Sequence, residues 1–346
     1  MNTTIALFLL QDGVINGAVY GLLGVTLVMV FTITRVIFVP QGEFVAWGAL
    51  TFAALEAGKV PGTAWLLVVL GAAAAILELV RDRTALTPRR VAVIVARDIA
   101  MPVAVLVGVV LLAPLLAGTV ARLVLTLVLL VPMGPLVYRL AFQPLADASV
   151  LVLFIAAIGV HIALVGLGLV FFGAEGFRTT PFSDAIVPLG PAVIKAQGLW
   201  VLAVTALLLA ALWAFFEFTL AGKALRATAV NRLGARLVGI PTRATGRAAF
   251  ALAAAIGALS GVLIGPLTTI YYDTGFLIGL KGFVAAIMGG LASYPLTALA
   301  AVLVGLLESF SAFVASPFKE VIVFSLIIPV LLWRSLAAGH QDEEET

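Results

Sequence analysis

Long apolar runs separated by short polar gaps are the feature that most constrains how this chain folds. Most runs approach or exceed the roughly 20 apolar residues that a helix needs to cross a lipid hydrocarbon core. Of 346 residues, 63% are hydrophobic and 11% are charged, and the mean hydropathy is +1.22. Soluble domains are about 45–50% apolar and about 25% charged. The pattern predicts a polytopic membrane protein with about eleven spans, at residues 5–34, 37–57, 63–80, 101–117, 119–140, 148–173, 198–220, 247–272, 276–292, 295–314 and 319–336.

The spans are expected to be helices, which makes the fold all-α. Backbone polar groups in lipid must be satisfied within the structure, so only helices and closed barrels cross a membrane. The runs lack the alternation of apolar and polar residues that is typical of barrel strands. We therefore expect a single transmembrane domain over residues 1–346.

The distribution of basic residues predicts the orientation of the chain. Lys and Arg are enriched in cytoplasmic loops. The gap 81–98 holds five arginines, and the loop 222–247 holds six Lys and Arg residues with no Asp or Glu anywhere between 218 and 272. Both are expected in the cytoplasm, which places the N-terminus outside and the acidic tail 337–346 inside. The gaps that fall outside by alternation are 57–62, 114–119 and 173–197.

One run fits this scheme less well than the others. Residues 275–293 are short and glycine-rich for a span, and they include Lys281. A broken or tilted helix has this composition. A segment that re-entered without crossing would move the C-terminus outside, away from the side that Arg334 favours, so we expect this segment to cross.

The basic loop has an internal pattern. Four apolar residues recur every four positions, which predicts one apolar stripe on a short helix. Arg232 and Arg236 lie one turn apart beside the stripe, and Gly239, Ile240 and Pro241 end the helix because proline cannot continue it. The basic residues have two explanations. They can serve only to keep the loop in the cytoplasm, or the loop can also dock on a partner protein. The apolar stripe favours docking. The stripe consists of Leu225, Ala229, Leu233 and Leu237.

Ionisable residues inside the apolar runs are candidates for a substrate path. Each costs about 2.5–3.5 kcal/mol at the centre of a helical span and must face protein, water or a partner. Glu43 follows Pro40 and Gln41, where a broken helix start would favour a carboxylate, and Gln41 is a further polar candidate for the path. The alternative for Glu43 is a structural cap. The four ionisable candidates are Glu43, His161, Lys281 and Glu308.

The remaining candidates have structural alternatives too. Lys281 and Glu308 can pair between neighbouring helices, which would serve packing as well as transport. A lone His161 in mid-span more often bonds a backbone carbonyl than a substrate or metal. Asn16 and Tyr20 share one helical face, where an amide and a phenol would line a polar path unless that face serves only close packing.

Enzymatic chemistry and nucleic-acid binding have little support. The sequence has no cysteine, two histidines and no HExxH string, so the usual zinc ligands are missing, and it has no GxxxxGK[ST] phosphate loop. No cofactor or metal is therefore expected in this chain. The net charge of +3 arises from inter-span gaps where orientation explains it.

Five segments resemble the bacterial ABC-importer permeases for branched-chain amino acids, a group that includes urea and amide permeases. They are NGAVYGLLGVTLVMVFTITRVIF at 16–38, QGE at 41–43, YRLAFQPL at 138–145, GKALRATAVNRLGARLVGIPT at 222–242 and GLKGFVAAIMGGLAS at 279–293. Residues 78–122 look like an inserted pair of spans relative to shorter members. Two departures stand out: no Glu begins the basic loop, and the Asn-Phe-Ala-His-Gly string common after the first span is replaced by Phe38-Val39-Pro40-Gln41-Gly42.

The resemblance implies a type II-like importer permease in the bacterial inner membrane that carries a branched-chain or related amino acid by alternating access. It implies a second permease, two cytoplasmic ATPase subunits that supply ATP and Mg, and a periplasmic substrate-binding protein. The loop would be the coupling segment that sits in a groove of the ATPase, through Arg226, Ala227, Ala229, Arg232, Leu233, Arg236, Gly239, Ile240 and Pro241. An ion-coupled secondary transporter for a small polar solute is the alternative; it would need a midplane carboxylate array or matching broken helices.

Overall fold

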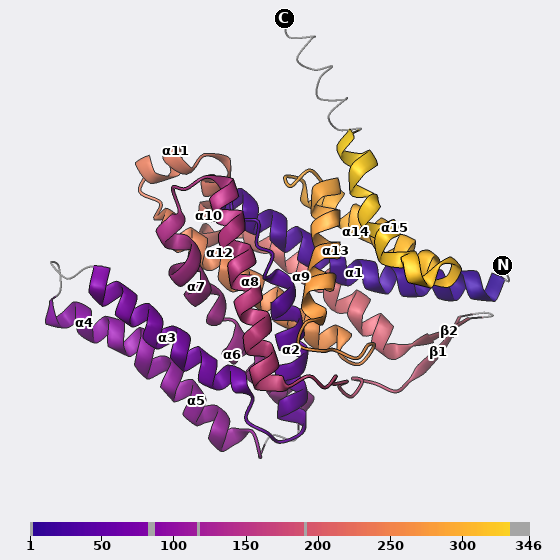
Figure 1. Ribbon diagram of the computed structural model, residues 1–346, viewed down its shortest axis with the longest axis horizontal. Coiled ribbons are helices and arrows are strands. Elements are labelled where there is room, and N and C mark those ends of the chain that lie inside the picture. Colours follow the sequence, from indigo (N-terminus) through magenta and orange to yellow (C-terminus); the bar gives the residue numbers. More distant parts are fainter. Residues whose placement is uncertain (1–2, 82–86, 116–117, 190–191, 333–346) are drawn as a thin grey trace, which may run out of the picture.

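The computed structural model describes residues 3–81, 87–115, 118–189 and 192–332 and is built almost wholly of helices (Figure 1). The predicted all-α class is confirmed, with one small antiparallel hairpin as the exception in the described part. The α-helices are α1 Thr3–Thr34, α2 Gln41–Glu56, α3 Gly62–Arg81, α4 Pro88–Val95, α5 Met101–Leu112, α6 Thr119–Leu130, α7 Met133–Val137, α8 Val150–Phe172, α9 Ala196–Phe218, α10 Leu220–Val230, α11 Arg232–Leu237, α12 Thr242–Ile264, α13 Thr274–Met288, α14 Tyr294–Val314 and α15 Lys319–Ser325. The shorter elements are the π turns η2 Ala96–Ala100 and η3 Tyr138–Phe142, the 3-10 turns η4 Gln143–Leu145 and η5 Ser316–Phe318, and the strands β1 Ile186–Leu189 and β2 Ala192–Lys195.

Eight helical stretches of the described chain, rather than eleven, are long and apolar enough to cross a membrane. The expected span at 37–57 is a helix of 16 residues, and that at 276–292 is a helix of 15 residues. Helices of this length extend only about 22–24 Å, against a hydrocarbon core of about 30 Å. The last expected span, 319–336, starts with the seven-residue α15, and the acidic tail 337–346 lies outside the described residues. Eleven spans are therefore not confirmed, because the apolar composition does not record where a helix breaks.

The two short helices meet near their N-terminal ends. Residues 35–40 are not helical, and Val36 and Phe38 are buried there, so the chain re-enters the protein before α2 begins. A Cβ on Gly42 of α2 would lie 2.0 Å from the carbonyl oxygen of Gly275 of α13. Only glycine permits such close backbone contact, so α2 and α13 form a pair of discontinuous helices inside the bundle.

Helix α1 is the central element of the bundle and packs along α14. A Cβ on Gly17 would lie 2.7 Å from the Cα of Val302, and one on Gly305 would lie 2.4 Å from the backbone nitrogen of Gly17. Small residues at a helix interface let two backbones approach, which is the usual packing of membrane helices. The core continues into α12 and α2, while α8 and α9 lie at the periphery with few of their side chains buried.

Helices α3, α4 and α5 project from one side of the molecule (Figure 1). Between residues 78 and 122, the described structure has one complete helix of membrane length, Pro88–Leu112, flanked by the end of α3 and the start of α6. Two crossings were expected in this interval. Whether these residues are an insertion relative to shorter family members stays a prediction.

The β hairpin and helix α11 lie far apart, at different ends of the molecule (Figure 1). The hairpin pairs Ile186 with Lys195 and Val187 with Ile194. It belongs to the loop between α8 and α9, which also forms a single bridge from Phe177 to Ile270. The two regions predicted to lie on opposite sides of the membrane, 173–197 and 222–247, are thus well separated.

Candidate functional site

A large polar cavity of about 1160 Å³ extends from the β hairpin to the middle of α1. Its walls come from α1, the loop that carries the hairpin, α13, α14 and α15. Four of the seven predicted path residues line it: Asn16, Tyr20, Lys281 and Glu308. The four-residue spacing of Asn16 and Tyr20 on α1 accounts for their shared exposure to the cavity.

Lys281, Glu308 and Tyr20 form a buried cluster at the inner wall of this cavity. The Lys281 Nζ donates to Glu308 Oε1, as predicted from the sequence, and the Tyr20 hydroxyl donates to Glu308 Oε2 at 2.5 Å. Lys281 Nζ also lies 3.3 Å from Glu320 Oε1 and 5.7 Å from the centroid of the Tyr20 ring. Three helices that are distant in sequence are thereby joined through one carboxylate. Pairing and hydrogen bonding offset the cost of burying these charges, and removal of one partner would leave an uncompensated buried charge.

Charges of both signs line the cavity in equal number. Four carboxylates and four basic groups contribute to the wall, and apolar side chains such as Ile15, Leu277 and Ile278 separate them. A zwitterion with an apolar side chain matches such a lining, because its ammonium and carboxylate groups each find an opposite charge. The carboxylates are Asp12, Asp184, Glu308 and Glu320, and the basic residues are Arg178, Lys195, Lys281 and Lys319.

The other three predicted path residues lie apart from this cavity, in a buried cluster around the start of α2. Glu43 Oε1 and His161 Nδ1 are 3.0 Å apart, and the His161 ring stacks on Phe276 with a centroid distance of 4.6 Å. Gln41 Nε2 donates to the Ala253 carbonyl at 2.9 Å. The expectation that His161 bonds a backbone carbonyl was wrong, since a carboxylate on a neighbouring helix provides its partner. Glu43 lies in the first turn of α2, as predicted for a broken helix start.

The basic loop folds into two short helices instead of one. Asn231 leaves the helical conformation, at φ −149° and ψ 100°, and its side-chain oxygen accepts from the Gly234 amide to begin α11. The predicted single stripe is therefore interrupted: Leu225 is buried against the bundle, and Ala229 is half-buried. Asparagine favours such a cap because its side chain satisfies a free backbone amide at the helix start.

On both sides of Asn231, four aliphatic side chains are exposed, while Ala235 is buried. Their exposed fractions are high for aliphatic residues: 83% for Val230, 67% for Leu233, 80% for Leu237 and 77% for Val238. We call these four residues the α11 patch. Contiguous exposed apolar side chains outside a lipid-facing helix mark a contact surface for another protein.

The loop arginines make contacts within the chain. Arg232 Nη1 donates to the Ala146 carbonyl at 3.1 Å, and Arg236 Nε donates to the Thr242 hydroxyl at 3.0 Å. Arg226 Nη2 lies 3.0 Å from Glu217 Oε2, where both side chains are exposed. Arg232 and Arg236 thus hold α11 against the neighbouring loops, and the α11 patch is left as the outward surface.

Several cavity residues escaped the sequence analysis. Asp12 lies one helical turn before Asn16 and two before Tyr20, so extending the same face backwards finds it. Glu320 and Arg178 lie in segments far from the other path residues, and no local pattern connects them to α1. Only the folded arrangement of α13, α14 and α15 brings Glu320 within reach of Lys281.

Comparison with known proteins decides the family. The family model described as the permease component of the branched-chain amino acid transport system matches residues 9–331, nearly the whole chain. The chain belongs to this family. With its eight apolar helices, this permease is a multi-pass membrane protein, and the family does not favour an ion-coupled transporter.

Named relatives of the permease are transport proteins. It is 31% identical over 210 residues to the high-affinity branched-chain amino acid transport system permease protein LivH of Salmonella typhimurium and to that of Escherichia coli strain K12. Each match covers 57% of this chain and 66% of the relative. It is 30% identical over 216 residues to BraD of Pseudomonas aeruginosa, covering 60% of this chain and 70% of the relative. The matched region thus spans a little under two thirds of the length of LivH.

Among solved structures, the permease aligns with PsaBC from Streptococcus pneumoniae in complex with Fab. The alignment covers 93% of this chain and 90% of the other, with 13% sequence identity and a TM-score of 0.41. This similarity is too low to transfer details of the fold.

Proposed function

We propose that this permease is the membrane-spanning subunit of an ATP-driven importer for branched-chain or related amino acids. The observation that carries the proposal is the cavity at the β hairpin, whose balanced charges and apolar walls suit a zwitterion with an aliphatic side chain. Family membership supports the same substrate class. Urea, amides and aromatic acids are the competing substrates, and they differ from this one in charge or in size.

The cavity would receive substrate on the side of the hairpin. Its inner wall is the Lys281, Glu308 and Tyr20 cluster, where opposite charges already satisfy each other. A bound amino acid would offer an ammonium group to Glu308 and a carboxylate to Lys281, exchanging one set of paired charges for another. Such an exchange costs little electrostatic energy, because no buried charge is left unpaired at any stage.

Energy would enter through the α11 patch. A cytoplasmic ATPase subunit that covers Leu233 and Leu237 would bury apolar area that is now exposed, at about 25 cal/mol per Å². ATP and Mg would be bound by the ATPase subunits alone. Closure of two such subunits would move α10 and α11 as rigid elements and, through α12, switch the path between its outward and inward states.

The complete importer would contain this permease, a second like or unlike permease, two ATPase subunits and a substrate-binding protein. The binding protein would dock near the β hairpin, with the N-terminus of the permease on the same side. The α11 patch would face the cytoplasm, in agreement with the six basic residues of the loop 222–247.

Uptake by the reconstituted complex tests the proposal. We expect proteoliposomes that contain the complex and the binding protein to accumulate labelled leucine, isoleucine or valine only when ATP is present on the ATPase side. Uptake of urea or an amide in place of these amino acids would contradict the substrate. Uptake that persists without ATP and collapses with the proton gradient would contradict the importer class.

A matched pair of variants tests the cavity itself. Glu308→Gln keeps the shape of the side chain but removes a buried charge, and we expect uptake to fall about tenfold or more, since a hydrogen bond to a charged group contributes about 1.5–3 kcal/mol. The control is Glu175→Gln, an exposed residue of the same loop that carries the hairpin and not part of the cavity wall. Equal uptake by both variants would show that substrate takes a different path.

A further inference from the structure

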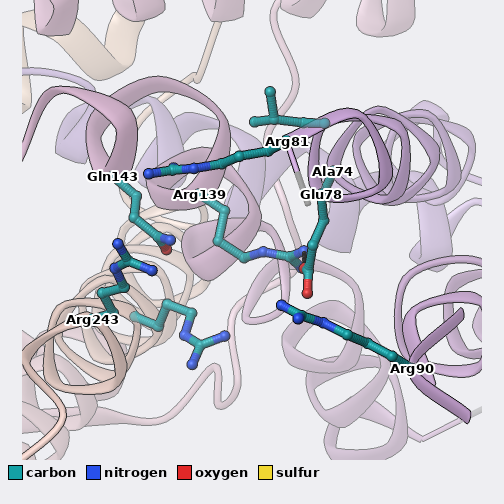
Figure 2. Close-up of a pocket in the computed structure, with 9 residues that line it drawn as sticks. Ala74, Glu78, Arg81, Arg90, Arg139, Gln143 and Arg243 are labelled. Atoms are coloured by element: carbon teal, nitrogen blue, oxygen red, sulfur yellow. Dashed lines mark hydrogen bonds and ion pairs between the residues drawn. The ribbon is translucent and has the colours of Figure 1, made fainter. Parts of the chain in front are cut away.

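A second, smaller cavity lies where the end of α3, the start of α4, the π turn η3 and the start of α12 meet. Its volume is about 190 Å³. Among the described residues, five guanidinium groups line it, together with one carboxylate, that of Glu78. Figure 2 shows arginine side chains entering this space from separate helices. The arginines are Arg81, Arg90, Arg139, Arg243 and Arg247.

The nearby carboxylates are already engaged by two arginines. Glu78 Oε2 lies 2.5 Å from Arg139 Nη2 and 2.6 Å from Arg97 Nη2. The buried carboxylate of Asp98 is also bonded to Arg97 and Arg139. Both carboxylates are therefore shared by Arg97 and Arg139, which reduces what they can offer to the other lining arginines.

Two of those arginines form no ion pair among the residues that the structure describes. In the described residues, neither Arg243 nor Arg247 forms a hydrogen bond or an ion pair, although both line the cavity. They lie four residues apart in the first turns of α12, so their side chains share one face. Like charges gathered in a partly enclosed space repel each other unless an anion neutralises them.

An uncharged group in the wall adds unused hydrogen-bonding capacity. Gln143 lines the cavity, and its Oε1 is buried without a hydrogen-bond partner. Buried amide groups in folded proteins are nearly always satisfied by protein, water or a bound ligand, so this atom has hydrogen-bonding capacity to spare at the cavity wall. Rotation of the amide would present its NH₂ group to an oxyanion, and the present orientation would accept from a hydroxyl group.

We propose that this cavity binds a phosphate group, presented by an anionic phospholipid head group or by a free phosphate ion. Arginine suits this ligand because its planar donors match phosphate oxygens in pairs. The volume is an order of magnitude above the roughly 10–15 Å³ that one water needs, which leaves room for a tetrahedral anion.

The surroundings of the cavity suit a lipid as the source of the phosphate. Ala74 and Leu77 form an apolar part of the wall, and Ile76 and Val80 are exposed on the same stretch of α3. Acyl chains of a phospholipid could lie along these side chains while its head group enters among the arginines. Basic pockets between membrane helices on the cytoplasmic side bind anionic head groups in this way.

Native mass spectrometry of the full chain in detergent tests the lipid source. We expect the wild type to retain phosphatidylglycerol in preference to phosphatidylcholine. The variant Arg243→Gln with Arg247→Gln should bind phosphatidylglycerol about twenty-five-fold more weakly, since each arginine near an anionic lipid contributes about fivefold. The matched control is Arg89→Gln with Lys223→Gln, which removes two exposed charges outside the cavity wall and should bind as the wild type does.

Inorganic phosphate, titrated in a thermal-shift measurement, tests the free-ion source with the same proteins. A phosphate-dependent stabilisation that the Arg243 and Arg247 variant loses, without any preference for phosphatidylglycerol, would support the site with a free ion as its ligand. If the double variant does not fold, as judged by gel filtration, Arg243→Gln alone should weaken binding about fivefold. Binding of both ligands within twofold of wild type in the arginine variant, or an equal loss in the control, would overturn the proposal.

Discussion

Arg139 and Asp98 form a two-pronged ion pair in which each residue lies in a π-helical turn. Arg139 Nη1 is 2.6 Å from Asp98 Oδ1, and Nη2 is 2.9 Å from Oδ2. Asp98 lies in η2, and Arg139 lies in η3, 41 residues later. Single π turns inside long helices often mark sites where a side chain must take a special position. Here the two turns bring a buried acid and a buried base together and attach the α4–α5 helix to the bundle.

The first prediction concerns this pair. The substitution Asp98→Asn removes one of the two carboxylates that pair with Arg139, which is only 9% exposed. Breaking a buried pair costs about 3–5 kcal/mol, and we expect the lower end of this range because Glu78 still pairs with Arg139. We expect a lower midpoint of thermal unfolding in detergent, measured by loss of the monodisperse gel-filtration peak. Asp147→Asn is the control, since the Asp147 side chain is 89% exposed and lies 3.9 Å from Arg236, and it should leave the midpoint unchanged.

The second prediction concerns the close contact between α1 and α14. Gly17→Leu places a side chain where a Cβ alone would be 2.7 Å from the Val302 backbone, so the helices must separate. Overpacking typically costs about 1–3 kcal/mol, and rigid backbone contact puts this case at the upper end. Gly166→Leu on α8 adds the same side chain where nothing lies within 4 Å. The unfolding midpoint should fall for Gly17→Leu alone; equal effects would show that α1 and α14 do not pack this closely.

The third prediction concerns the coupling between Lys281 and Glu308. Lys281→Met leaves two neighbouring carboxylates, Glu308 and Glu320, without their shared cation. Glu308→Gln leaves Lys281 with Glu320 alone. If the residues act as a pair, the double variant should be more stable than the sum of the single losses predicts, by about 0.5–3 kcal/mol. A double-mutant cycle on unfolding midpoints measures this interaction, and additive losses would contradict it.

The pair of Lys281 and Glu308 was predictable from the sequence. A charge in lipid is costly unless it is paired, and few ionisable residues lie inside the apolar runs. The same argument failed for His161, whose partner Glu43 is 118 residues away and was itself a candidate. The cost of an unpaired charge in lipid limits which residues can pair, but it does not determine which helices become neighbours. The ion pair of Asp98 and Arg139 was missed for this reason, since both residues were counted only as markers of orientation.

Helix boundaries were the other source of error. Residues 37–40 of the non-helical segment are largely apolar, so hydropathy alone joined them to α2 in the expected span 37–57. Asn231 lies within the predicted single helix, between stripe residues Ala229 and Leu233, and its capping role was not recognised, although asparagine caps helices well. The Asn231 side chain accepts a hydrogen bond from the Gly234 amide, which ends α10 and begins α11. The predicted stripe is therefore divided into a buried part on α10 and an exposed part on α11.

The fourth prediction follows from that division and concerns the α11 patch. Because Arg232 and Arg236 bond to Ala146 and Thr242 of the same chain, changing them would disturb the loop itself, whereas Leu233 and Leu237 have exposed side chains. The variant Leu233→Gln with Leu237→Gln should therefore insert and unfold as the wild type does, yet lose most of its co-purifying ATPase, since an aliphatic side chain buried at an interface contributes about 1.5–3 kcal/mol.

The matched control for this variant is Lys223→Gln, an exposed residue on α10 of the same loop. It should keep the ATPase bound, because the α11 patch is unchanged. ATPase retained by the leucine variant at wild-type levels would mean that α11 faces no partner and that another surface transmits the energy of ATP hydrolysis. Loss of the ATPase together with normal insertion would assign docking to apolar burial at α11, with the loop arginines serving to hold that helix in place.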